Sequence, residues 1–226
     1  MRATLLQPLF DAGQLWQGQS VRTTTVYSSG DPHLDQRLLG GGWPAHGLLE
    51  CLTTLPAPAL LSLWLPVWQH LSAHGRGLGL LNAPHRLSAE GLHQQGIHPS
   101  LVHVVQCPTD QQAWTLEQLA CSGTLTSLLC CTDAPYQTKQ LRRLQLAAQD
   151  NGCQVVLLRH SQVRHHPSPA PTRWLLTRAQ HSWQIELFKQ AGHPAATVCL
   201  PTHPMLTTPC PPAMRAVALL QTNAVQ

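Results

Sequence analysis

Residues 47–63 read GLLECLTTLPAPALLSL, and they contain the first strand, turn and helix start of a pattern that the rest of the chain repeats. The mostly apolar run over 48–52 predicts a buried β-strand. A turn over 53–59 separates it from 60–74, which predicts a helix with a kink at Pro66. Strand, turn and helix in this order form the first half of a βαβ unit, so we expect a parallel sheet.

The chain downstream continues the alternation of strand and helix. Strands are predicted over 77–81, 101–106, 125–132 and 154–159, and helices over 88–95, 110–122 and 137–151. Gly96, Gly123 and Gly152 directly follow the three helices, where glycine favours termination. We therefore predict an α/β fold with a mostly parallel sheet flanked by helices.

Both ends of this core have a different pattern. On the N-terminal side, 21–27 predicts a strand, and Asp31 and Pro32 begin a short helix that Gly40–Gly42 end. On the C-terminal side, a polar loop over 160–172 precedes an antiparallel hairpin over 173–178 and 183–188, with one more strand over 197–200. We divide the chain into an N-terminal arm over 1–25 with a helix over 4–17, a core over 26–200, and a proline-rich tail over 201–226 with a short helix over 214–221.

The composition indicates a chain that works with a partner. Its 226 residues fit one domain of ordinary size. Charged residues make up only 11%, against roughly a quarter in soluble domains, and a weakly charged surface favours association. The net charge of +4 permits contact with nucleic acid but does not require it.

The eight cysteines predict a reducing, cytoplasmic environment, because no export signal is recognised before them. Five of them fall in or beside predicted strands and are expected to be small buried hydrophobes: Cys51, Cys130, Cys131, Cys153 and Cys199. No run of eighteen apolar residues occurs, so we expect no membrane contact.

Six segments in order resemble the ImuA/SulA family of degenerate RecA-like proteins over about residues 26–200. They are GDPHLDQRLLGGGWPAHGLLE (30–50), GLGLLNAPHRLSAEGLHQQGI (77–97), LVHVVQCPTDQQAWTLEQLACSG (101–123), LTSLLCCTD (125–133), CQVVLLRH (153–160) and WQIELFKQAGHPAATV (183–198). The resemblance implies a RecA-like, mostly parallel sheet flanked by helices, with a C-terminal antiparallel hairpin.

The same resemblance places an ATPase site in the chain, and its chemistry is missing. A phosphate-binding loop ends in Gly-Lys-Ser/Thr, whose backbone N–H groups and lysine hold phosphates. The matching turn has Thr53, Thr54, Pro56, Pro58 and Ala59, and its prolines lack N–H donors. The resemblance further puts Pro84 at the position of the water-activating glutamate, and Thr132 or Asp133 at that of the metal-binding aspartate. We therefore expect no ATP hydrolysis, no catalytic residue and no cofactor.

The resemblance implies an accessory role in SOS-induced, error-prone translesion DNA synthesis. The expected partners are an ImuB-like Y-family protein, a DnaE-type error-prone polymerase, RecA and single-stranded DNA. The alternative is a SulA-type cell-division inhibitor that binds FtsZ. The length, the long lead-in over 30–44 and the extended C-terminus favour the ImuA type.

The loop over 160–172 and its flanks are the candidate DNA contact. Arginines and an aromatic ring on a loop suit phosphate contact and base stacking. The candidates are Arg159, Arg164, His165, His166, Arg173, Trp174 and Arg178. The alternative is a solvated loop whose charges offset apolar neighbours.

Two further segments are candidate docking surfaces for a protein partner. In the N-terminal arm these are Leu9, Phe10, Leu15 and Trp16. On the helix predicted over 137–151 they are Lys139, Arg142 and Arg143. For that helix, the alternative is an amphipathic core helix with a basic outer face.

Two other patterns have simpler explanations. QIELF, 184–188, resembles the sliding-clamp-binding pentapeptide, but its alternation favours an ordinary sheet strand. His70 and His74 have metal-ligand spacing on a helix, yet no third ligand is evident. Cys130 and Cys131 point to opposite faces of a strand, so they cannot bind one metal ion together. We expect no metal site.

Overall fold

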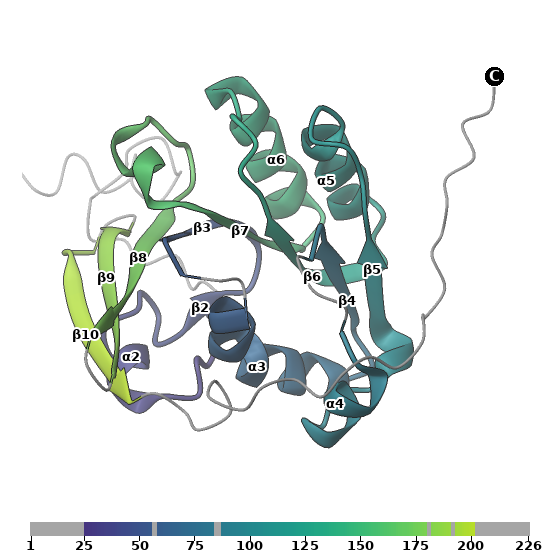
Figure 1. Cartoon of the computed structure of the whole chain (residues 1–226), viewed down its shortest axis with the longest axis horizontal. Coiled ribbons are helices and arrows are strands. Elements are labelled where there is room, and N and C mark those ends of the chain that lie inside the picture. Colours follow the sequence, from purple (N-terminus) through teal and green to yellow (C-terminus); the bar gives the residue numbers. More distant parts are fainter. Residues whose placement is uncertain (1–24, 56–57, 84–86, 180–181, 191–192, 202–226) are drawn as a thin grey trace, which may run out of the picture.

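The computed structural model describes residues 25–55, 58–83, 87–179, 182–190 and 193–201 (Figure 1). The helices predicted over 4–17 and 214–221 lie outside the described residues, as does most of the arm and tail. The helices and strands, with η for a 3-10 helix, are β1 (Val26–Tyr27), α2 (Pro32–Asp35), β2 (Trp43–Pro44), β3 (Gly47–Thr53), α3 (Pro58–Ala73), β4 (Gly77–Leu81), α4 (Ala89–Gln94), η1 (Pro99–Leu101), β5 (Val102–Val105), α5 (Gln112–Cys121), β6 (Leu125–Cys131), α6 (Thr138–Asp150), β7 (Gln154–His160), η2 (Ser161–His165), β8 (Thr172–Ala179), β9 (Ser182–Gln190) and β10 (Ala196–Pro201).

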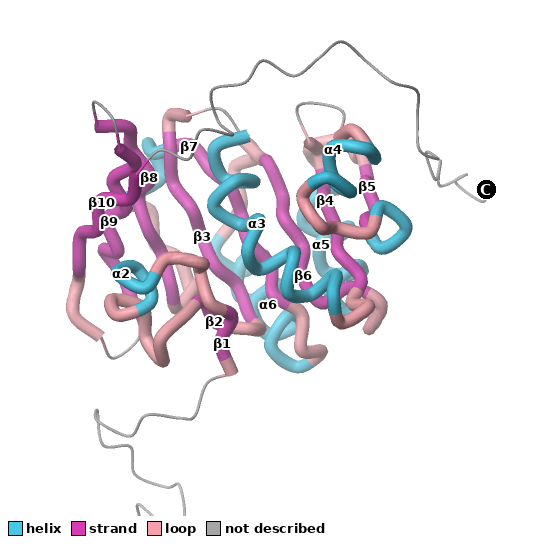
Figure 2. The backbone as a smooth tube through the Cα atoms, turned by 90° about the horizontal axis from the view of Figure 1, so that it is seen from below, coloured by secondary structure: helices cyan, strands magenta, loops and turns pink. Residues whose placement is uncertain are grey.

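An eight-stranded sheet in the order β10-β9-β8-β3-β7-β6-β4-β5 forms the centre of the molecule. The six strands from β8 to β5 are parallel, while β9 is antiparallel to β8 and β10 is antiparallel to β9. Helices α3 and α4 cover one face and α5 and α6 the other (Figures 1 and 2). The predicted α/β class, the mostly parallel sheet and the C-terminal hairpin are confirmed, and the arrangement is consistent with a RecA-like core.

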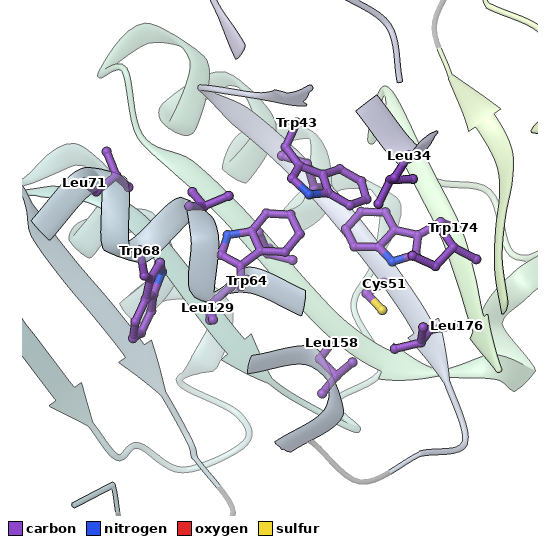
Figure 3. Close-up of a cluster of buried hydrophobic side chains, with 14 of the residues drawn as sticks. Leu34, Trp43, Cys51, Trp64, Trp68, Leu71, Leu129, Leu158, Trp174 and Leu176 are labelled. Carbon is purple, nitrogen blue, oxygen red and sulfur yellow. The ribbon is translucent and has the colours of Figure 1, made fainter. Parts of the chain in front are cut away.

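The hydrophobic core is split by the sheet into two layers. Under α3, the indole rings of Trp43, Trp64 and Trp174 pack together, with ring centroids 4.6–5.8 Å apart (Figure 3). Leucines of α5 and α6 pack on the opposite face, with Leu116 and Leu144 almost fully buried. Because consecutive residues of a strand point to opposite faces, Trp174 faces α3 while its neighbour Arg173 faces the α6 side.

Most predicted boundaries agree with the structure to within two residues, and the main differences are local. Helix α2 ends at Asp35, several residues before Gly40, because Asp31 caps a single turn and further turns follow it. The strand predicted over 21–27 is described only as Val26–Tyr27. Cys51, Cys130 and Cys153 are buried as expected, but the expectation was wrong for Cys199, which is exposed on edge strand β10.

Candidate functional site

A cavity of about 470 Å³ opens at the carboxyl ends of the parallel strands. Ligands of open α/β sheets bind at this edge, so it is the first place to look for chemistry. The lining residues end or follow β3, β4, β6 and β7, or lie at or just before the start of α5: Thr53, Thr54, Leu55, Asn82, Thr109, Gln112, Cys131, Thr132, Asp133, Ala134, Leu158, Arg159 and His160. No lysine occurs among the described residues that line it.

In the turn after β3, the Thr53 hydroxyl group bonds one backbone N–H of the turn. The Thr53 hydroxyl donates to the Leu176 carbonyl, at 2.8 Å, and accepts from the Leu55 N–H, at 2.9 Å. That N–H therefore has a partner within the protein, whereas a phosphate-binding turn presents its N–H groups to the ligand. Thr54 is exposed. Pro56 lies outside the described residues, and Pro58 and Ala59 are described only as part of α3.

The far wall of the cavity is a polar network. Thr132 is buried, and its hydroxyl donates to the Gln112 side-chain oxygen at 2.5 Å and accepts from the Ala134 N–H at 2.9 Å. Asn82 adopts a left-handed φ of 53°, and its amide bonds both the N–H and the carbonyl of Cys107. These side chains are occupied in holding the loops that follow β4 and β6.

Asp133 is exposed, and among the described lining residues it is the only acid. Over the part of the chain that the structure describes, no three His, Cys, Asp or Glu side chains gather in a way that could hold a metal ion. Pro84, which the sequence resemblance aligns with a water-activating glutamate, lies outside the described residues. Among the described lining residues, Arg159 is the one arginine or lysine, and its guanidinium group is paired with Glu50 rather than free for a phosphate.

A buried ion-pair triad lies beside the cavity, on the α6 side of the sheet. Glu50 in β3 is fully buried, and its two carboxylate oxygens accept from Arg159 Nη1 at 2.9 Å and from Arg173 Nε at 2.6 Å. Both arginine residues are only 5% exposed. A carboxylate buried in a strand requires such partners, since an unpaired charge in the interior is very costly.

The triad also anchors the loop that follows β7. Arg173 donates to the carbonyl groups of Val163, Arg164 and His166. Arg164 in turn makes a bidentate ion pair with Glu186 of β9. The guanidinium groups of Arg164 and Arg173 both lie over the Phe188 ring. Lys189 Nζ also donates to the Ser168 carbonyl at 2.7 Å. Burial, together with the nearby Arg173 charge, lowers the Lys189 pKa.

The DNA-contact prediction is wrong for three of its residues. Arg159 and Arg173 are buried in the triad, with Arg159 reaching only the cavity wall, and Trp174 is fully buried under α3, so none presents its side chain on the outer surface to a DNA strand. Arg164 is half-buried and paired. His165, His166 and Arg178 are exposed, but the histidines end η2 whereas Arg178 lies near the far end of β8. The structure therefore does not assemble the predicted set into one surface.

The docking candidates on α6 are exposed. Lys139, Arg142 and Arg143 lie on its outer face, and Arg143 forms an ion pair with Glu117 of α5 at 2.7 Å. Sequence reasoning missed Trp114 of α5, which is 62% exposed. The arm residues Leu9, Phe10, Leu15 and Trp16 lie outside the described residues.

The remaining patterns behave as ordinary structure. QIELF lies in β9, with Ile185 and Leu187 buried, as the alternation predicts. His70 of α3 and His74, which directly follows α3, are exposed with ring centroids 4.5 Å apart. Burial raises the pKa of the Cys131 thiol, at the cavity wall, to about 11, so it is a poor nucleophile and metal ligand at neutral pH.

Comparison of the sequence with models of protein families found no match, and comparison with curated proteins found none either. In the described part of the chain, no helix has both the length and the apolar character needed to cross a membrane.

Proposed function

We propose that the chain is a non-catalytic accessory protein of SOS-induced, error-prone translesion DNA synthesis. It acts in the cytoplasm by docking with an ImuB-like Y-family protein and a DnaE-type polymerase, with RecA and single-stranded DNA as further partners. The proposal extends the sequence resemblance, and one structural observation carries it. The mostly parallel sheet is present, while at its carboxyl edge the Thr53 hydroxyl donates to the Leu176 carbonyl of β8 and accepts from the Leu55 N–H.

Loss of the phosphate cradle with retention of the fold favours a role for the surface. Phosphoryl transfer requires a cradle, a metal and a positioned water. The described cavity has no lysine and a single carboxylate, Asp133. What the fold still provides is a rigid three-layer body with exposed helices on both faces of the sheet.

The test is direct binding between purified proteins. We expect the full chain to bind an ImuB-like protein, in titration calorimetry or size-exclusion chromatography, and not to bind FtsZ. We also expect no phosphate release from ATP in the presence of Mg²⁺. Binding to FtsZ alone would support the SulA-type alternative and overturn the proposal, and so would ATP hydrolysis that Asp133→Ala abolishes.

A further inference from the structure

Exposed apolar side chains concentrate on the two helices that cover one face of the sheet. Among the described residues, the large hydrophobic side chains that stand exposed are Val104, Trp114 and Leu146. Trp114 of α5 is 62% exposed and Leu146 of α6 is 50% exposed. The two helices pack side by side (Figure 1). An exposed tryptophan is uncommon on a free surface and typical of binding hot spots.

One of these two helices, α6, carries a row of cations. On α6, Lys139 is followed after three or four residues by Arg142 and Arg143, and these in turn by Leu146. This helical spacing places the four side chains in one stripe along the outer face. The ion pair from Arg143 to Glu117 joins this stripe to α5, and Trp114 lies one helical turn before Glu117. Lys139 and Arg142 are exposed and make no ion pair with any described residue.

We propose that this surface, the α5–α6 face (Trp114, Glu117, Lys139, Arg142, Arg143 and Leu146), docks an acidic segment of a partner protein. The partner places an apolar side chain against Trp114 and another against Leu146. Its carboxylates reach Lys139 and Arg142, which have no ion-pair partner in the described part of the chain. Apolar anchors with opposite charges around them are the usual composition of a protein docking site.

The positive charge of the α5–α6 face disfavours the other molecules or segments that could cover it. The chain's own segments do not complement the face: 1–24 contains Arg2 and Arg22 against Asp11, and 202–226 contains Arg215 as its one charged side chain. A second copy in a symmetric contact would bring cations against cations. Single-stranded DNA would find two unpaired cations, which neutralise about two phosphates and give weak affinity at physiological salt.

The inference deepens the proposed function, because it names the face through which the partner is held. The experiment measures the affinity of the full chain for three purified probes: an ImuB-like protein, FtsZ and a single-stranded oligothymidine. The variants are Trp114→Ala, Leu146→Ala and the double variant Lys139→Glu with Arg142→Glu. The matched control reverses two exposed cations elsewhere, Arg37→Glu with Arg76→Glu.

We expect Trp114→Ala to weaken binding of the ImuB-like protein about 10-fold or more, as a hot-spot residue does. The double reversal should weaken binding by a similar factor, mainly through slower association at low salt. The Arg37 and Arg76 control should bind as the wild type does. All the changed side chains are exposed or half-exposed, so the variants should keep the wild-type melting temperature to within about 3 °C.

The outcomes separate the two proposals. If the ImuB-like protein binds every α5–α6 variant as tightly as the wild type, the inference fails and the proposed function stands. If FtsZ alone binds, and loses affinity through the α5–α6 variants, the inference stands and the proposed function fails. If the oligothymidine alone binds, or if no probe binds, both are overturned.

Discussion

Replacing Glu50 with glutamine tests whether the buried triad holds the sheet and its loop together. Glutamine keeps the size of the side chain but removes its charge, and its one carbonyl oxygen cannot serve both Arg159 and Arg173 as the two carboxylate oxygens do. At least one arginine is then left buried and uncompensated. Removing one partner of a buried ion pair costs about 3–5 kcal/mol.

That loss is a large part of the stability of a domain, which is about 5–15 kcal/mol in total. For a domain of this size, each kcal/mol shifts the melting temperature by about 2–4 °C, so we expect a fall of about 6–20 °C. Urea unfolding followed by tryptophan fluorescence measures the free energy of unfolding directly, because Trp43, Trp64 and Trp174 are buried in the core.

The matched control is Glu186→Gln. Glu186 also pairs with an arginine, but its side chain is 35% exposed and that of Arg164 is 32% exposed. Ion pairs open to solvent are worth about 0–1 kcal/mol, and this half-buried pair keeps solvent access on both partners, so the variant should lose far less stability than Glu50→Gln. If Glu50→Gln unfolds within 1 kcal/mol of Glu186→Gln, the assignment of the triad as a stabilising element is refuted.

A triple variant separates stability from loop anchoring. Glu50→Leu with Arg159→Met and Arg173→Met replaces all three charges by apolar groups of similar volume, which is often neutral or stabilising. The carbonyl groups of Val163, Arg164 and His166 nevertheless lose their donor. We expect most of the lost stability to return while amide hydrogen exchange over 161–169 rises. Unchanged exchange there would show that Arg173 does not anchor the loop.

Three further predictions concern the thiols, the sheet packing and the cavity. Iodoacetamide at pH 8 should alkylate exposed Cys121 about 100-fold or more faster than Cys131, because the raised pKa of about 11 leaves little thiolate at Cys131. Peptide mass spectrometry measures the two rates. Gly77→Ala should lower the free energy of unfolding by about 1–3 kcal/mol, measured in urea, since the added Cβ would lie 2.2 Å from the Thr124 carbonyl oxygen; an unchanged value would contradict this packing. Mg–ATP at 1 mM should leave the melting temperature unchanged, whereas a dissociation constant of 10 μM would add about 2.7 kcal/mol and produce a clear upward shift.

Much of the architecture could be predicted from local patterns. The apolar runs and the glycines after helices located the strands and helices of the core, because a strand buried on both faces must be apolar and a helix ends readily at glycine. The order of strands in the sheet could not be predicted from these patterns, since parallel strands are joined by crossovers and their neighbours depend on tertiary packing.

The candidate site was predicted less well, because burial depends on what covers a side chain. Arg173 and Trp174 are adjacent in sequence and look available beside a polar loop, yet one is buried on each face of the sheet. A sequence signal for the triad existed: Glu50 is a charged residue inside an apolar strand, and such a residue requires a buried partner. Leu146 is out of phase with Leu141, Leu144 and Ala148, so helical periodicity could have placed it on the surface.

The amino-acid sequence alone establishes the fold class and the absence of a Gly-Lys-Ser/Thr motif from the turn over 53–59. Both are local: hydrophobic periodicity sets each element, and the motif is read directly from consecutive residues. Only the tertiary structure decides which charges remain free. Glu50 lies 109 residues before Arg159 and 123 before Arg173, and their pairing removes those arginines from the surface. Of the candidate cations, Lys139 and Arg142 on α6 and Arg178 in β8 are exposed without an ion pair among the described residues, whereas Arg159, Arg164 and Arg173 are paired, because ion pairing is set by distance in space.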